Sequence, residues 1–204
     1  SFPTRRSSDL EIYDDLSKGK EKLCISQGQL IENVILEAEK AWKSETQVDN
    51  ILLTAPTGSG KSLLFQLPAI YLGKEYNLLT IVVSPLKALI VDQVESLQEL
   101  GYARVAYASS DLSPEQKMEV YRQVREGEID LFYLSPELLL SYDIKHFVGE
   151  RRIGLVVVDE AHTVTTWGKE FRVDYWFLGR YLTALKQTLG YNFPLFALTA
   201  TAVW

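Results

Sequence analysis

Two polar stretches contain the residue types that phosphate chemistry requires. In the first, TAPTGSGKS, glycines precede the adjacent Lys61 and Ser62, and the whole stretch follows an apolar run. Glycines let backbone N–H groups turn toward a polyphosphate, a lysine reaches its β and γ phosphates, and a serine hydroxyl binds Mg²⁺. The order of strand, loop and helix favours this site over a simple turn with a solvated lysine. The residues expected to contact phosphate or metal are Thr57, Gly58, Ser59, Gly60, Lys61 and Ser62.

The second stretch, VVVDEAH, ends an apolar run in two adjacent carboxylates. A protein that binds a triphosphate needs an acid for the metal and a group that orients the attacking water. We expect Asp159 to coordinate Mg²⁺ and Glu160 to polarise that water. Taken alone, the pair could be a strand-end turn with a helix-capping Asp. The phosphate loop upstream favours the catalytic interpretation.

Other polar candidates follow the predicted strands. His162 either links the carboxylates to Thr199 and Thr201, at the end of a later strand, or makes an ordinary structural hydrogen bond. The Pro-bent turns at residues 84–87 and 135–137 either present main-chain N–H groups to nucleic-acid phosphates or simply start helices. The candidates for backbone contact in these turns are Ser84, Pro85, Lys87, Ser135, Pro136 and Glu137.

Apolar strands that alternate with helices must position these residues. The predicted strands cover residues 50–56, 78–85, 103–109, 129–136, 153–160 and 194–200. The predicted helices cover residues 26–42, 61–72, 87–100, 114–124 and 178–188, with short helical pieces up to 147. Short, nearly continuous apolar strands between helices indicate an α/β fold with a mostly parallel sheet and helices on both faces. Ligands of such sheets bind beyond the carboxyl ends of the strands, where the polar stretches lie.

The composition sets broad limits. With 204 residues the chain has room for one domain and a short appendage, and no run approaches the length of a membrane span. The net charge of −6 disfavours a surface that is basic throughout, but it allows a local basic strip. A single cysteine, Cys24, and no visible secretory signal indicate a cytoplasmic, nucleoid-associated location, or the nucleus in a eukaryote. Residues 1–10 lack any period and are expected to be a disordered or non-native lead-in.

Five motifs in order carry a family resemblance. They are APTGSGKSLLFQLPA, VVSPLKALIVDQV, LFYLSPELL, VVDEAHTVTTWGKEFRVDY and ALTATA. Together they resemble the first RecA-like motor domain of superfamily-two helicases, and closely that of the RecQ family of DNA helicases. W-G-x-x-F-R after DEAH is the part most particular to RecQ, and Ala55 in place of the first glycine of the phosphate loop also occurs in helicase-like proteins.

The resemblance implies a RecA-like P-loop NTPase fold and an ATP-dependent, 3′-to-5′ DNA unwinding motor that uses ATP and Mg²⁺. Its partners would be single-stranded and duplex DNA and a second RecA-like domain of the same full-length chain, with no membrane partner. Residues 11–48 would hold an adenine-recognition motif and residues 49–204 the ATP-binding domain. Without the second domain, which supplies an arginine finger, we expect little or no hydrolysis.

The resemblance also places an aromatic-rich loop that senses single-stranded DNA after the carboxylates. Ring stacking tolerates any base and contributes ~1 to 3 kcal/mol for each base. The residues assigned to DNA contact are Trp167, Lys169, Phe171 and Arg172. Tyr175 and Trp176 are assigned mainly to packing, and the alternative is that all four aromatic residues form a small core under the loop. The family's Gln and His are replaced by Thr166 and Lys169, so the coupling is where we expect this protein to differ.

SQGQLIENVI resembles the family's adenine-recognition segment. Gln29 stands at the adenine-reading position, because a side-chain amide both donates to and accepts from a base edge. Ile25 and Ser26 replace the usual Phe-Arg pair, and the alternative is an exposed glutamine on a helix.

Two other functions stay open. One is a related translocase or RNA helicase that does not unwind DNA processively. The other is a regulatory module that binds a nucleotide without hydrolysing it, against which the intact Lys61, Asp159 and Glu160 argue.

Overall fold

The computed structural model describes residues 9–13, 22–45, 47–55, 58–159 and 168–199, and their side chains at 26–45, 47–55, 58–159 and 178–199. The strands are β1 (Asp9–Tyr13), β2 (Lys22–Ser26), β3 (Ile51–Thr54), β4 (Leu79–Val83), β5 (Val105–Ala108), β6 (Leu131–Leu134), β7 (Ile153–Val158) and β8 (Leu195–Thr199). The helices are α1 (Gln27–Trp42), α2 (Leu63–Tyr76), α3 (Lys87–Glu99), α4 (Pro114–Arg125), α5 (Pro136–Ser141), α6 (Ile144–Val148) and α8 (Gly168–Leu189). None of these helices is long and apolar enough to cross a membrane.

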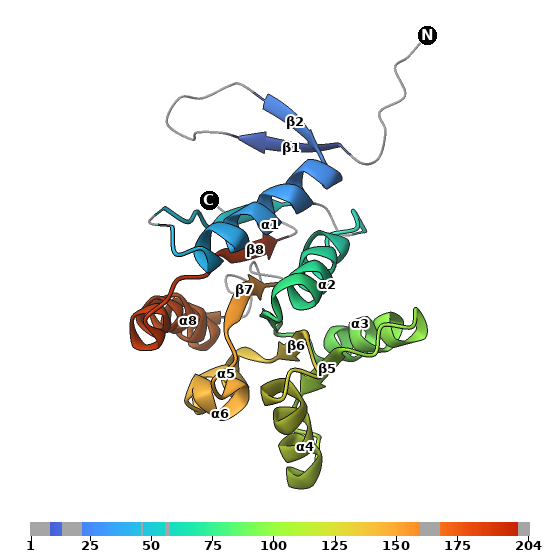
Figure 1. The fold of residues 1–204 in the computed structure, drawn as a ribbon, viewed down its shortest axis with the longest axis vertical. Coiled ribbons are helices and arrows are strands. Elements are labelled where there is room, and N and C mark those ends of the chain that lie inside the picture. Colours follow the sequence, from blue (N-terminus) through green and yellow to red (C-terminus); the bar gives the residue numbers. More distant parts are fainter. Residues whose placement is uncertain (1–8, 14–21, 46, 56–57, 160–167, 200–204) are drawn as a thin grey trace.

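Six of the strands form one parallel sheet in the order β3-β8-β7-β4-β6-β5. Helices α1, α2 and α3 cover one face, and α4, α5, α6 and α8 cover the other, as Figure 1 shows. Neighbouring strand residues therefore face different cores. In β6, Tyr133 packs with the first set of helices and Phe132 with the second. The predicted α/β class is confirmed, because strands buried on both faces produced the nearly continuous apolar runs in the sequence.

Local signals explain where the helices begin and end. Ser26 and Ser113 each form a capping box at the start of α1 and α4, in which the glutamine three residues later accepts a hydrogen bond from the serine N–H. Helix α2 ends at Asn77, whose left-handed backbone lets the next N–H, that of Leu78, reach back to the Leu72 carbonyl at 3.2 Å. These caps satisfy terminal backbone groups that have no partner within the helix.

A buried ionic cluster joins the strands at the end of the sheet opposite the polar stretches. Asp130, which is fully buried before β6, accepts hydrogen bonds from Arg104 before β5 and from Arg151 before β7. Tyr102 donates a further hydrogen bond to this carboxylate over 3.0 Å. A Cβ added at Gly73 would lie 2.3 Å from Asp130 Cγ, so only glycine fits there. The cluster fixes the starts of three adjacent strands, and thereby the positions of their far ends.

Two predicted boundaries are wrong. Helix α8 begins at Gly168, not near residue 178 as predicted. Phe171, Tyr175 and Leu178 have helical spacing, whereas the crowded aromatic residues favour a loop when the sequence alone is considered. Strand β1 includes Asp9 and Leu10, the last residues of the lead-in expected to be disordered or non-native, and pairs antiparallel with β2. That pairing joins separated segments, so the local pattern of the first ten residues does not reveal it.

Candidate functional site

The carboxyl ends of β3, β4, β7 and β8 meet at one edge of the sheet. The Ala55 N–H, just after β3, donates to the Thr199 carbonyl at 3.0 Å, and the Asp159 N–H, just after β7, donates to the Val83 carbonyl at 2.9 Å. The structure therefore brings together the start of the phosphate loop, the first carboxylate and the Thr199 segment. The convergence follows from the parallel register, because all these strands end at the same edge.

The phosphate loop has the backbone shape of an anion-binding turn. Gly58 and Gly60 have φ angles of +79° and +76°, in the left-handed region that glycine alone adopts without strain. Such alternation around Ser59 turns successive N–H groups toward a common centre. A Cβ at Gly58 would meet no atom within 4 Å, so the left-handed backbone, and not crowding, requires glycine there. Helix α2 follows directly and adds the positive end of its dipole.

Lys61 and Asp159 bring opposite charges to this loop. Lys61 is buried, and its Nζ donates to the Ala55 carbonyl at 3.0 Å, so the ammonium lies across the base of the loop. Asp159 is also buried. The Ser62 side chain makes no capping hydrogen bond to α2. Ammonium, hydroxyl and carboxylate are the groups that a triphosphate with its cation requires.

Two buried hydroxyls near this edge also fit a polar ligand. Ser59 Oγ in the loop and Ser84 Oγ after β4 are buried without a hydrogen-bond partner among the described residues. No group of three or more His, Cys, Asp or Glu in the described part of the chain could hold a metal alone. A Mg²⁺ ion bound here would therefore need phosphate oxygens and water as ligands, which is how Mg²⁺ is usually held with nucleotides. The residues present fit Mg²⁺ and a triphosphate bound together.

The two glutamines at the start of α1 have different partners. Gln29 Oε1 accepts from the Ser26 N–H at 2.8 Å, so the predicted adenine-reading side chain completes the capping box of an exposed helix start. Its role toward a base stays a prediction. Gln27, which the sequence reasoning missed, donates from Nε2 to the Ser59 carbonyl in the phosphate loop at 2.9 Å. No local pattern reveals a contact across 32 positions.

A buried tyrosine joins the elements beneath the site. The Tyr133 hydroxyl on β6 donates to Gln93 Oε1 of α3 at 3.0 Å and accepts from Gln66 Nε2 of α2 at 3.3 Å. Burial raises the pKa of Tyr133, so the phenol stays neutral. Helix α2, which follows the phosphate loop, is thus tied to helix α3, which begins just after the turn at Pro85.

The predicted contacts to a nucleic-acid backbone receive little support from the geometry. Ser84 is 2% exposed and its N–H donates to the Leu134 carbonyl, so it has no exposed group for DNA, contrary to the prediction. The Ser135 hydroxyl accepts from the Leu138 N–H and caps α5, which is the helix-start alternative. Lys87 is exposed and forms an ion pair with Asp111.

The remaining candidates are described in part or not at all. Thr57, Glu160, His162, Trp167 and Thr201 lie outside the described residues. The backbone of α8 includes Lys169, Phe171, Arg172, Tyr175 and Trp176, so these belong to a helix and not to the predicted loop.

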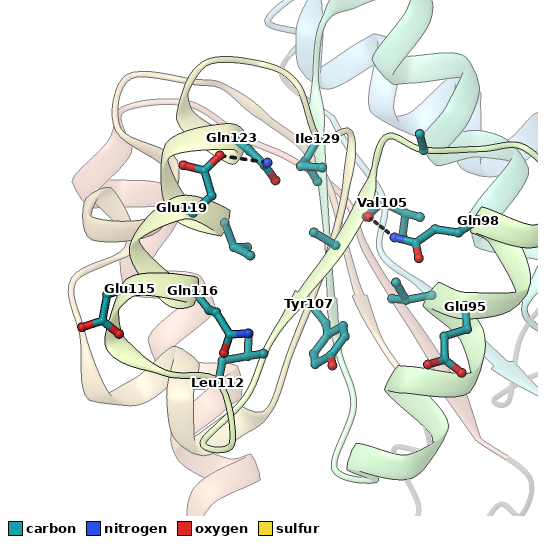
Figure 2. A pocket seen from close by; sticks show the side chains of 14 residues that line it. Glu95, Gln98, Val105, Tyr107, Leu112, Glu115, Gln116, Glu119, Gln123 and Ile129 are labelled. Carbon is teal, nitrogen blue, oxygen red and sulfur yellow. Dashed lines mark hydrogen bonds between the residues drawn. The ribbon is translucent and has the colours of Figure 1, made fainter.

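A separate groove of about 820 Å³ lies along edge strand β5, between α3 and α4 (Figure 2). Its lining includes Glu95, Glu115 and Glu119 and no lysine or arginine. Carboxylates repel phosphate, so this acidic groove does not suit a nucleotide.

Comparison with known proteins agrees with this geometry. The DEAD/DEAH box helicase family matches residues 36–203. The chain is 42% identical over 156 residues to the ATP-dependent DNA helicase RecQ of Synechocystis sp., covering 74% of this chain and 31% of that protein. It is 37% identical over 153 residues to the RecQ of Bacillus subtilis, covering 75% and 24%. The chain thus spans less than a third of the length of these relatives.

Solved structures show the same fold. The DUF1998 helicase MrfA bound to DNA superposes with a TM-score of 0.66 over 98% of this chain and 26% of that chain, at 20% identity. At this identity the likeness shows the fold alone, which is RecA-like. With the family match over most of the sequence, the chain belongs to the DEAD/DEAH box helicase family.

Proposed function

We propose that this chain is the ATP-binding motor domain of a RecQ-like DNA helicase. The observation that carries the proposal is the meeting of a left-handed glycine loop, buried Lys61 and buried Asp159 at one edge of a parallel sheet. The likeness to RecQ proteins at 37% to 42% identity supports this family's substrate, DNA, over other nucleic acids.

Each residue has a defined task in ATP binding. The loop N–H groups around Gly58 and Gly60 receive the phosphates, and Lys61 exchanges its bond to the Ala55 carbonyl for bonds to β and γ oxygens. Ser62 and Asp159 hold the cation, and Glu160 orients the attacking water. Bound Mg²⁺ supplies charge neutralisation on the phosphates. This assignment rests on positioning and charge, which dominate phosphoryl transfer.

A short chain of contacts offers a route for coupling to DNA. Thr199 holds Ala55 through the Ala55 N–H, and Ala55 holds Lys61 through its carbonyl. A shift of the Thr199 segment therefore reaches the phosphate loop through two hydrogen bonds. DNA sensed by Trp167 and by the start of α8 would act through this segment and through His162. A second RecA-like domain of a longer chain would complete the hydrolytic site.

The test uses the full-length protein and measures phosphate release with and without single-stranded DNA. We expect DNA to stimulate hydrolysis, and Glu160→Gln to abolish it while ATP still binds. Equal rates with and without DNA would refute the RecQ-type coupling. No hydrolysis under any condition would favour the regulatory module. Strand displacement on matched DNA and RNA duplexes identifies the substrate, and unwinding of RNA alone would establish the RNA helicase alternative.

A further inference from the structure

The contact between Gln27 and the phosphate loop lies outside the roles assigned so far. Gln27 is the first residue of α1, and its partly buried Nε2 donates to the Ser59 carbonyl at 2.9 Å. A carbonyl can only accept, so the amide nitrogen must face it. Ser59 lies between the two left-handed glycines, at the centre of the loop. The hydrogen bond from Gln27 therefore fixes the orientation of the peptide group between Ser59 and Gly60.

Because this peptide is trans, fixing its carbonyl also fixes the direction of its N–H. The chain has no cis peptide among its described residues, so the Ser59 carbonyl and the Gly60 N–H point in opposite directions. Holding the carbonyl toward α1 turns the Gly60 N–H away from α1, to the opposite side of this peptide. A Cβ at Gly60 would lie 3.2 Å from Gln27 Nε2, which shows how closely the amide lies against this glycine.

The anchor is on a rigid element. The capping box at Ser26 fixes the first turn of α1, and Leu30 and Val34 of the next turns are buried in the core under the sheet face. Fixing the backbone of a free loop residue costs conformational entropy. A loop whose peptide is already held loses less freedom when a ligand binds, so its affinity is higher.

We propose that Gln27 is a positioning residue that orients the Gly60 N–H for binding of the nucleotide's phosphates. The inference rests on the proposed function, since it concerns the same loop. It differs from the predicted role of Gln29, which concerns the base: Gln27 acts on the phosphates through the loop and needs no contact with the nucleotide.

The experiment compares ADP with inorganic tripolyphosphate, both with Mg²⁺, in calorimetric titrations of this chain. Gln27→Met keeps the length of the side chain and removes the donor. The matched control is Gln98→Met, because Gln98 also donates its amide to a backbone carbonyl, that of Val105, far from the loop. Thermal unfolding of each variant reports whether the fold is intact.

We expect Gln27→Met to lower the affinities for ADP and for tripolyphosphate by the same factor, roughly three- to tenfold. This is the effect of losing about one neutral hydrogen bond. Gln98→Met should leave both affinities unchanged. Equal affinities of wild type and Gln27→Met would overturn the inference about Gln27 but not the proposed function. A loss of affinity for ADP without a loss for tripolyphosphate would also overturn the inference, because it would mean that Gln27 contacts the base. Absence of binding by the wild-type chain would overturn the proposed function and the inference with it. If Gln27→Met unfolds, Gln27→Ala is the second variant, because it removes the donor without adding a charge, and the same pattern is required of it.

Discussion

Replacement of Asp130 by asparagine tests what holds the strands in place at the end of the sheet opposite the site. The carboxylate accepts from Arg104 at 2.6 and 2.8 Å and from Arg151 at 2.8 Å. The Arg104 side chain is 43% exposed, so water screens its ion pair with Asp130. The Arg151 side chain is only 4% exposed, so its ion pair with Asp130 is screened much less. Asp130→Asn therefore leaves the Arg151 guanidinium buried without a counter-charge, which costs about 3 to 5 kcal/mol.

Thermal unfolding measures this cost. For a chain of this size each kcal/mol shifts Tm by about 2 to 4 °C, so Asp130→Asn should lower Tm by about 6 to 20 °C. Arg122→Met is the control, because Arg122 contacts Glu119, Glu126 and Glu128 but its side chain is 39% exposed. Water screens exposed ion pairs, so Arg122→Met should change Tm little. If both variants lose the same stability, burial does not decide the strength of the Asp130 cluster and the reasoning is refuted.

The pH dependence gives a second measurement of the same cluster. Burial raises the pKa of Asp130, but the hydrogen bonds from Arg104 and Arg151 outweigh burial and hold this pKa below its usual range. A depressed carboxyl pKa contributes stability that is present above the unfolded value, about 3.9, and is lost as pH falls through the folded value. The difference in Tm between wild type and Asp130→Asn should therefore be constant near neutral pH and shrink below about pH 4.

Three further changes test the site. Lys61→Met should weaken MgADP binding in calorimetry by roughly tenfold to a hundredfold, since it removes charge-assisted bonds to phosphate, and unchanged affinity would exclude Lys61 from the site. Gly60→Ala should weaken tripolyphosphate binding while it lowers Tm only slightly, because a side chain strains the loop backbone at a φ of +76°. Normal binding by this variant would show that the left-handed backbone is not needed. Tyr133→Phe should cost about 1 to 3 kcal/mol in chemical unfolding, because Gln66 and Gln93 lose a buried partner, and a neutral effect would mean that the two amides pair with each other.

Most of the fold could be predicted from the sequence. The strands and helices from residue 26 to 159 follow the predicted order, because apolar period and capping residues such as Ser26 and Ser113 act over a few neighbouring positions. Ligands bind at the carboxyl ends of parallel strands, so Lys61 and Asp159 could be predicted to lie at the same edge without knowledge of the strand order. One error lies where a local pattern had two interpretations, in the aromatic segment that forms the start of α8, and another where strand β1 pairs with a separate segment.

By itself, the sequence determined that this protein has alternating strands and helices, a glycine loop before a helix and a carboxylate after a buried strand. Only the tertiary structure decided which candidates share the site. In the folded chain Ser84 is buried and its N–H donates to a neighbouring strand, and Gln29 caps α1. Gln27 donates a hydrogen bond to Ser59, which lies 32 positions away in the sequence. The physical reason is that period and capping depend on neighbours along the chain, whereas burial and long-range hydrogen bonds depend on which surfaces meet when the helices pack on the sheet.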